Sequence, residues 1–290
     1  MSAAWSANSG DDQRAMVYKT GPGALLDVFE DIEQQRKWVI EQDPHYLQTY
    51  PSNLRALATC FADRGGRLTN LRQVRTIGES VPEGLRGQCR EVWDVPLIDM
   101  YSAEEVGYMA LQCPDHDHYH VQSESVVLKI LDDDGKPCPP GRVGRVVVSV
   151  LHNFAMPLIR YEIMDHAEAG EPCPCGRGLP VIRRVLGKQR HMILLPDGTK
   201  HWPCFPPHLW TQVAPIRQYQ LVHRDPTSIE ARIVIDRKLT DAETAKLIAN
   251  LNKSLGHPFT IDFKYMDRIE RSKSGKYEEF VGLDQGESRA

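Results

Sequence analysis

The chain contains 290 residues, of which 41% are hydrophobic and 26% are charged; this composition suits one large domain or two ordinary ones and argues against disorder. Its 35 basic residues stand against 39 acidic ones, so the net charge of -4 provides no global basic field for nucleic acid or an anionic membrane. We see no apolar signal segment at the N-terminus, no run long enough to span a bilayer, and an odd cysteine count that disfavours a disulfide scaffold; together these predict a cytoplasmic protein with neither nucleic acid nor membrane as a partner.

The N-terminal region alternates between helical and extended patterns. Apolar residues at helical spacing predict a helix over Leu25–Glu41 and a second over Leu54–Arg64, with Ser52 or Asn53 as its N-cap and Gly65 at its end. Strands are predicted over Leu71–Ile77 and Pro96–Met100, with a short helix over Pro82–Cys89 between them. This order of strand, helix and strand predicts α/β layering.

Extended patterns dominate the middle of the chain. Runs rich in Val, Ile and Leu predict strands over Val126–Leu131 and Val143–Leu151, with a turn at Asp132–Pro137 between them. A strand-like run also covers Val121–Val127, and Gly187–Gly198 has the pattern of another strand and turn. This part of the chain therefore has a substantial β component.

The C-terminal part has a different organisation. A hairpin is predicted from Ile216–His223 and Ile229–Asp236, followed by a capping box at Thr240–Glu243, a helix that ends at Gly256, and a strand over Phe259–Tyr265. Such a ββαβ unit can close a small core of its own. We therefore predict two domains, a large α/β domain over residues 1–189 and a small α+β domain over residues 190–290.

Two acidic motifs offer groups that suit nucleotide chemistry, and each also has an ordinary interpretation. Tyr101 and the carboxylate of Glu105 follow a predicted buried strand, where they suit a nucleotide or a metal ion, although a polar loop has the same composition. Asp165 ends a strand-like run, where its carboxylate can accept hydrogen bonds from a ribose diol, although a salt bridge with Arg160 is an equal alternative.

A third motif, Ser272–Lys276, lies near the C-terminus. Gly275 beside Lys276 lets both the backbone and an ammonium group approach an anion closely. The spacing does not match a Walker A loop, and a solvated basic tail has the same composition. Taken singly, this motif favours the tail.

Two clusters of cysteine and histidine have the composition of a zinc site. Cys113 is followed by His116, His118 and His120, and a Cys-Pro-Cys segment lies several dozen residues downstream. Two short clusters that offer thiolate and imidazole can form a closed tetrahedral site, although Cys-x-Cys is tighter than the usual Cys-x2-Cys spacing. Scattered polar loop residues are the alternative. The other four cysteines stand alone, as Cys60, Cys89, Cys138 and Cys204.

The order of these motifs resembles that of the adenylate-forming ligase superfamily, and most of all its branch of phenylacetate–coenzyme A ligase and relatives. The matching segments are Ile77–Ser80, Asp99–Glu105, Ile159–Asp165, Gly187–Lys188 and Ser274–Lys276, together with the Cys-Gly-Arg element at Cys175–Arg177. The resemblance covers the chain from about Tyr50 to its end. It implies an α/β fold with a partial large adenylate-forming domain of mixed sheets, followed by a small α+β C-terminal lid domain.

The resemblance also implies a role for each matching residue. Nucleotide binding would fall to Gly78, Glu79 and Ser80 along the adenine pocket, Tyr101 stacked on adenine, Asp165 on the ribose, and Lys188. Catalysis would depend on Lys276 of the lid and on Glu105, which would hold magnesium. Zinc would be bound by Cys113, His120, Cys173 and Cys175, with His116 and His118 as spare candidates; we prefer His120 because a strand-like run follows it.

The activity that the resemblance implies has two steps and several cofactors. A carboxylic acid, aryl or arylacetic, would be activated by ATP and magnesium to an acyl adenylate, and a thiol such as coenzyme A would then displace AMP. Zinc would be structural. The implied partners are a small-molecule carboxylic acid and a thiol acceptor, with a partner chain or a homodimer as further expectations.

Several departures from the family pattern keep a second function open. The family's Gly-rich phosphate loop is missing, so the chain is expected to begin partway through the large domain. Glu104 stands where Ser or Thr is usual, Ser102 replaces Gly, Lys188 replaces Arg and Arg190 occupies the place of the hinge Asp. The alternative is a truncated, non-catalytic, zinc-stabilised remnant that binds a nucleotide or another protein.

Overall fold

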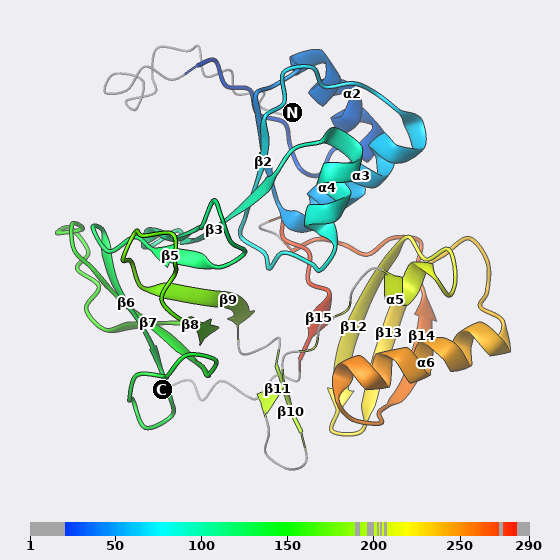
Figure 1. Ribbon diagram of the computed structural model, residues 1–290. Coiled ribbons are helices and arrows are strands. Elements are labelled where there is room, and N and C mark those ends of the chain that lie inside the picture. Colours follow the sequence, from blue (N-terminus) through cyan, green and yellow to red (C-terminus); the bar gives the residue numbers. More distant parts are fainter. Residues whose placement is uncertain are drawn as a thin grey trace.

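The structure is a computed structural model that describes residues 21–188, 192–195, 200–201, 203, 205, 208–272 and 275–282. The described part contains one large sheet with helices at one end, and a smaller sheet domain towards the C-terminus (Figure 1). The expected mixed α/β fold class, with a separate smaller C-terminal domain, is therefore confirmed. None of the helices in these ranges combines the length and hydropathy needed to cross a bilayer.

The large sheet mixes parallel and antiparallel strands. Within the described ranges its order is β1 (Tyr46–Thr49), β2 (Gln73–Ile77), β3 (Leu97–Ala103), β4 (Gly107–Gln112), β5 (Tyr119–Val121), β9 (Val181–Lys188), β8 (Tyr161–Ala169), β7 (Val143–Val150) and β6 (Val126–Leu131). The first three strands are parallel and the remaining pairings are antiparallel. Parallel strands need crossover connections, which explains why the described helices that pack on this sheet lie at its β1–β3 end.

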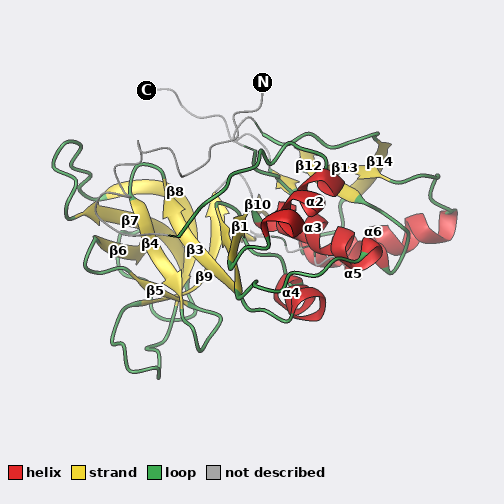
Figure 2. Cartoon of the chain, turned by 90° about the horizontal axis from the view of Figure 1, so that it is seen from above, coloured by secondary structure: helices red, strands yellow, loops and turns green. Residues whose placement is uncertain are grey.

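Three helices of the described part of the chain cover that parallel end. They are α2 (Ile32–Gln42), α3 (Pro51–Arg64) and α4 (Leu85–Trp93), and they lie beside β1–β3 in both views (Figures 1 and 2). Their apolar faces meet the sheet in one buried cluster that includes Leu54 and Leu57 of α3 together with Val74 of β2. A second cluster fills the antiparallel region around Met109, Val146 and Ile182. This packing fixes the ends of β2 and β3, which the candidate site uses.

The C-terminal sheet has the order β14 (Thr260–Tyr265), β13 (Ser228–Val234), β12 (Gln218–Asp225) and β15 (Phe280–Val281). Helix α6 (Asp241–Leu255) lies across one face of this sheet, as Figure 1 shows. The short elements α5 (His208–Thr211), β10 (Ile193–Leu194) and β11 (Lys200–His201) complete this part. Its buried cluster draws on residues from Ile193 to Phe280. The domain boundary proposed at residues 189 and 190 falls on residues outside the described ranges, so it stays a prediction.

Several element boundaries differ from the sequence predictions, because capping residues determine where helices begin. The helix predicted from Leu25 begins at Ile32, since Asp31 is its N-cap and accepts a hydrogen bond from the Glu33 N–H. Neither Ser52 nor Asn53 caps the next helix. It begins one turn earlier, at Pro51, whose fixed φ suits the first turn of a helix. Helix α4, in contrast, begins later than predicted and covers Leu85–Trp93.

Two predictions of extended structure also need correction. The run Val121–Val127 is not one strand: β5 ends at Val121 and β6 begins at Val126, with a turn in which the Ser125 N–H donates to the Gln122 carbonyl. The strand predicted over Gly187–Gly198 is instead the end of β9, which runs from Val181 to Lys188, and the separate strand β10. In the first case this turn interrupts the apolar run; in the second, residues 189–191 and 196–199 lie outside the described ranges.

The predicted capping box of α6 is present and supports a testable stability effect. Thr240 Oγ1 accepts from the Glu243 N–H at 3.3 Å, and a Glu243 carboxylate oxygen accepts from the Thr240 N–H at 2.8 Å. Replacing Thr240 with alanine is expected to lower the free energy of unfolding by about 1 kcal/mol, because an N–H at the helix start loses its acceptor. Urea denaturation measures this change, and Thr240→Ser should restore most of it. Equal stability of the alanine variant and the wild type would contradict the prediction.

Candidate active site

A pocket of about 500 Å³ lies between the large sheet and the chain segment that precedes β15. All the residues expected to handle a nucleotide line this pocket: Gly78, Glu79, Ser80, Tyr101, Glu105, Asp165, Lys188 and Lys276. They come from the β2–α4 loop, from β3 and the turn after it, from β8, from β9 and from the segment before β15. Residues from distant parts of the sequence are therefore brought to one cavity.

Tyr101 and Asp165, which both line the pocket, are joined by a hydrogen bond. The Tyr101 hydroxyl donates to a carboxylate oxygen of Asp165 at 2.8 Å, and Tyr101 is buried within the core of the large sheet. Burial, reinforced by the neighbouring Asp165 carboxylate, raises the pKa of the Tyr101 hydroxyl, so it acts as a hydrogen-bond donor at neutral pH. Asp165 is half-buried within β8, not at its end, and the contact with Tyr101 orients its carboxylate.

Two further charged residues, Glu105 and Lys188, line the pocket. The Tyr161 hydroxyl donates to a carboxylate oxygen of Glu105 at 3.2 Å, which orients a half-buried acid at the pocket edge. Lys188 of β9 pairs in register with Asp165 of β8, so a cation and an anion face the cavity from adjacent strands. The pocket therefore offers acidic groups beside basic ones, as a site for a phosphate ester with a bound cation requires.

Asp99, to which we assigned no role from the sequence, also lines the pocket through a buried side chain. It is 5% exposed and accepts hydrogen bonds from the Thr76 hydroxyl at 2.5 Å and from the Tyr119 hydroxyl at 2.7 Å. Burial raises the pKa of its carboxyl group, while these two donors act in the opposite direction. Because Thr76 lies on β2 and Tyr119 on β5, Asp99 joins three strands close to Tyr101.

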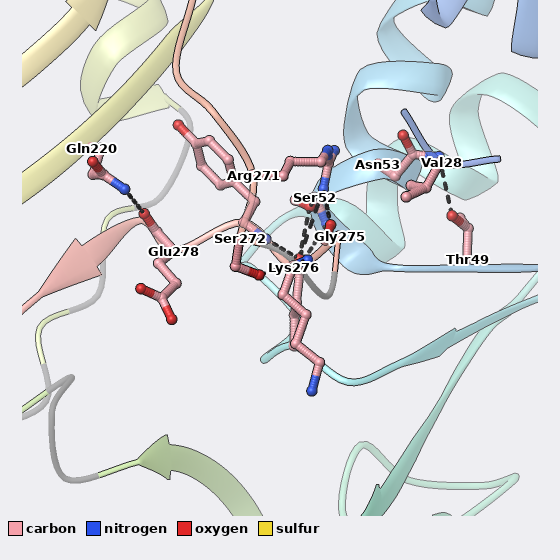
Figure 3. A network of polar contacts seen from close by, with 12 residues as sticks. Val28, Thr49, Ser52, Asn53, Gln220, Arg271, Ser272, Gly275, Lys276 and Glu278 are labelled. Carbon is pink, nitrogen blue, oxygen red and sulfur yellow. Dashed lines mark hydrogen bonds and ion pairs between the residues drawn. The ribbon is translucent and has the colours of Figure 1, made fainter. Parts of the chain in front are cut away.

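Lys276 enters the pocket from the C-terminal side. Its side chain passes over Gly78, whose φ of 82° favours glycine; a Cβ there would lie 3.2 Å from Cε of Lys276 and 3.0 Å from the Tyr50 ring. In Figure 3 the Lys276 side chain extends away from the polar contacts of Arg271 and Ser52. The ammonium group thus lies apart from the network that holds its backbone.

A second set of residues, missed in the sequence, attaches this lysine segment to the large domain. It comprises Ser52 and Arg55 on α3, and Arg271, Tyr277 and Glu279 beside Lys276. The contacts join residues that lie far apart in sequence, such as Arg55 and Glu279 at 2.7 Å. No motif of short spacing signals them, although the charges of Arg271 and Glu279 on either side of Lys276 offered a weak indication.

The expected zinc ligands converge at another place in the same sheet. Cys113 follows β4, His120 lies within β5, and Cys173 and Cys175 lie between β8 and β9. The four ligand atoms lie within 4.8 Å of one another; the Cys113 and Cys173 sulfurs are 3.9 Å apart, and Cys175 Sγ lies 3.3 Å from His120 Nε2. His116 and His118 stack on each other outside this group.

The donor set fits a structural zinc ion. Tetrahedral zinc with bonds of about 2.0–2.3 Å requires ligand atoms roughly 3.5–4 Å apart, so these two contacts need little change and the widest pair must contract. A backbone hydrogen bond from Arg177 lowers the pKa of the Cys175 thiol to about 6, which favours its thiolate, whereas burial raises the pKa of the Cys173 thiol to about 11. Three thiolates and one imidazole would fill the coordination sphere and leave no open position for a substrate.

The fold and the pocket define a two-part protein with a cavity of about 500 Å³ between a large mixed sheet and a small C-terminal sheet domain. Comparison with known proteins agrees with this description. Residues 207–281 match the model of the CapK C-terminal domain. The chain is 28% identical over 170 residues to the phenylacetate-coenzyme A ligase of Thermus thermophilus, a match that covers 56% of this chain and 38% of the relative.

Solved structures share the same fold at low sequence identity. The 2-hydroxyisobutyryl-CoA ligase in complex with R3-HIB-AMP has a TM-score of 0.68 at 17% identity, covering 87% of this chain and 57% of that one. The anthranilate CoA ligase AuaEII in complex with anthranoyl-AMP has a TM-score of 0.61 at 16% identity, covering 84% and 50%. The resemblance to the adenylate-forming ligases, in the phenylacetate–coenzyme A ligase-like branch, is therefore confirmed. The chain spans between 38% and 57% of the length of these relatives.

Proposed function

We propose that this chain forms the nucleotide-facing part of an ATP-dependent ligase that activates a carboxylic acid, aryl or arylacetic, and transfers the acyl group to a thiol such as coenzyme A. One observation carries the proposal: Lys276 shares a single pocket with Tyr101, Glu105 and Asp165. Adenylation needs a cation beside the reacting phosphate and acids that hold the metal ion and the ribose, and here Lys276 of one domain and the two acids of the other line the same pocket. The similarity to acid–CoA ligases supports the same activity.

The proposed reaction proceeds in two steps, adenylation of the acid and transfer of the acyl group to the thiol. A carboxylate oxygen of the acid attacks the α-phosphorus of ATP, and the bond from that phosphorus to the pyrophosphate oxygen breaks. The thiol, losing its proton to the medium, then attacks the acyl carbonyl and releases AMP. Lys276 neutralises charge that develops between the two reacting anions, while Asp165, held by Tyr101, accepts hydrogen bonds from the ribose hydroxyls.

The remaining pocket residues have supporting roles in this proposal. Gly78 and Ser80 line the adenine side, the Tyr101 ring offers a stacking face, and Lys188 contributes positive charge near Asp165. Glu105 would hold magnesium: a single oriented carboxylate suits a cation that keeps several waters and binds phosphate oxygens. Magnesium, when bound, neutralises charge on the phosphates. Zinc at the Cys113 cluster would hold the sheet together.

Acid-dependent exchange of labelled pyrophosphate into ATP tests the proposal. The assay uses a panel of aryl, arylacetic and short aliphatic acids, with zinc-loaded protein whose folding is checked by circular dichroism. Exchange with the aromatic acids is the expected result. A folded protein that binds AMP and gives no exchange with any acid would contradict the ligase function and favour the non-catalytic remnant. Exchange only with aliphatic acids would contradict the substrate class alone.

Binding of AMP provides a test of the site that does not require turnover. Replacing Asp165 with alanine is expected to weaken AMP binding by about tenfold to 100-fold, because the ribose hydroxyls lose a charged acceptor. Isothermal titration calorimetry measures the affinity. Asp133→Ala, in the exposed turn after β6, serves as a control that should bind as the wild type does. Equal AMP affinity of the Asp165 variant and the wild type would remove Asp165 from the nucleotide site.

A further inference from the structure

The chain between β14 and β15 crosses from the C-terminal sheet to the large domain and returns. We call residues 271–272 and 275–279, the described part of this crossing, the strap. The strap is closed locally, since the Gly275 N–H donates to the Ser272 carbonyl and the Ser272 N–H donates to the Lys276 carbonyl. It carries Lys276, which lines the pocket. What holds the strap on the large domain therefore determines where this lysine lies.

Glu79 is the acceptor that joins the strap to the large domain. One carboxylate oxygen accepts from the Tyr277 N–H at 2.6 Å and from the Ser52 hydroxyl at 3.0 Å, and the other accepts from the Ser52 N–H at 2.9 Å. The Arg271 guanidinium lies 3.9 Å from the first oxygen and itself donates to the Ser52 hydroxyl at 2.8 Å. The side chain of Glu79 is only 10% exposed, so its contacts are shielded from water.

This arrangement gives Glu79 two tasks at once. Ser52 lies in the first turn of α3, where N–H groups lack helical acceptors, and the N-cap residue Tyr50 provides no side-chain acceptor. Glu79 takes over that capping role from outside the helix, at the end where the helix dipole favours an anion. The same carboxylate binds Tyr277, so the strap is attached to the end of a helix that is packed in the core.

The bond to Tyr277 acts directly on Lys276. The Tyr277 N–H belongs to the peptide group whose carbonyl is that of Lys276, so Glu79 fixes the backbone from which the lysine side chain extends. Gly275 packs closely on the other side, where a Cβ would lie 2.9 Å from Val28 and 3.3 Å from Tyr50. Figure 3 shows the strap residues Arg271, Ser272 and Gly275 gathered beside Ser52, with Lys276 projecting from them.

We propose that Glu79 is a positioning residue for adenylation: it holds Lys276 in the pocket by binding the Tyr277 peptide, and it does not contribute its carboxylate to the nucleotide. This proposal rests on the proposed function, because Lys276 matters only if the pocket performs adenylation. Its carboxylate oxygens are occupied by Ser52, Arg271 and Tyr277, although Glu79 lines the same cavity as the other expected adenine-pocket residues.

A second anchor on the same helix supports the role of α3 as the docking element. Arg55, about one turn after Ser52, forms the 2.7 Å ion pair with Glu279 and lies 3.3 Å from the Tyr219 hydroxyl. Both ends of the strap thus bind one helix. Removing Glu79 would leave the mostly buried Arg271 without its anionic partner, which disfavours the docked position.

Glu79→Gln tests this inference because it keeps the shape and removes the charge. Hydrogen exchange of the Tyr277 amide, followed by mass spectrometry of a peptide spanning 271–282, in which this amide keeps its label, should accelerate by about tenfold or more. The kcat of pyrophosphate exchange should fall by about tenfold to 100-fold with the AMP affinity unchanged, because a displacement of a catalytic group by about 1 Å lowers the reaction rate by about this factor. Transfer from a supplied acyl adenylate to coenzyme A should keep the wild-type rate. Glu83→Gln, an exposed acid in the same loop, is the matched control.

The outcomes separate this role from a purely structural one. If Glu79 served only as a cap of α3, hydrogen exchange of the backbone amides would accelerate at the start of α3. The hydrogen exchange of the Tyr277 amide and the kcat of pyrophosphate exchange would stay as in the wild type, and that result overturns the proposal. Adding Glu79→Gln to Lys276→Ala should cause no further loss of kcat, and an additive loss would also overturn it. A wild type without pyrophosphate exchange contradicts the proposed function, yet the Tyr277 amide still reports whether Glu79 holds the strap. If the Glu79 variant does not fold, Arg271→Gln removes the opposite charge and should release the same amide.

Discussion

Replacing Lys276 with alanine is expected to reduce acid-dependent pyrophosphate exchange by about 100-fold or more, while AMP affinity stays close to that of the wild type. The ammonium group is the cation that the C-terminal domain brings into the pocket beside Tyr101 and Asp165. Its strongest interaction is with charge that develops as the carboxylate reaches the α-phosphate, so its loss acts on the transition state more than on the bound nucleotide.

A lysine on the same domain but outside the pocket provides the control. Lys246 is exposed on α6, and Lys246→Ala should retain both exchange and AMP binding. Rates measured under saturating ATP and acid separate kcat from KM, and a loss confined to kcat is the expected signature. Unchanged exchange in the Lys276 variant would refute a catalytic role for this lysine.

Removing the proposed zinc ion is expected to cause the largest change in stability. An ion present at about 1,000 times its dissociation constant stabilises the folded state by about 4 kcal/mol. For a domain of this size that corresponds to a fall in Tm of roughly 8–16 °C when the ion is removed. Cys173→Ser should produce a comparable fall and abolish stoichiometric zinc binding, because it removes one of the four convergent ligands.

Metal analysis and calorimetry of the same samples check both parts of this prediction. Cys60→Ser is the matched control: Cys60 lies outside the cluster, contacts Glu33 on α2, and a serine hydroxyl can make the same contact. This variant should keep its zinc and its Tm. If the wild type contains no zinc, or if a chelator leaves its Tm unchanged, the site is not a structural zinc centre.

The elements that were predicted well are those determined by short-range patterns. The strand Val126–Leu131 and the helix that follows the Thr240 capping box lie where the sequence indicated, because alternation and capping act over a few residues. Errors arose where a turn or a cap competed with an apolar run, as between Val121 and Val126. Strand β15 was missed because Phe280 and Val281 become a strand only by pairing with β12.

For the candidate site, too, short motifs predicted individual residues, whereas only the folded structure showed which of them lie together. Motif order along the chain was enough to select Tyr101, Asp165 and Lys276, because each belongs to a short segment with a recognisable composition. Their presence in one pocket, and the hydrogen bond from Tyr101 to Asp165, required β3 and β8 to be placed in one sheet. Roles can therefore be assigned from local sequence only as expectations, since distances between side chains depend on packing.

The amino-acid sequence alone determined the fold class, the resemblance to adenylate-forming ligases and the two cysteine clusters, because residue periodicity and the order of motifs are properties of the chain before it folds. Only the tertiary structure decided what holds Lys276 in place. Glu79 and Tyr277 are 198 residues apart, and their contact exists because the core orients α3 and the β2–α4 loop towards the returning strap. No local pattern encodes such a contact, since its energy comes from burying groups that the folded chain alone brings together.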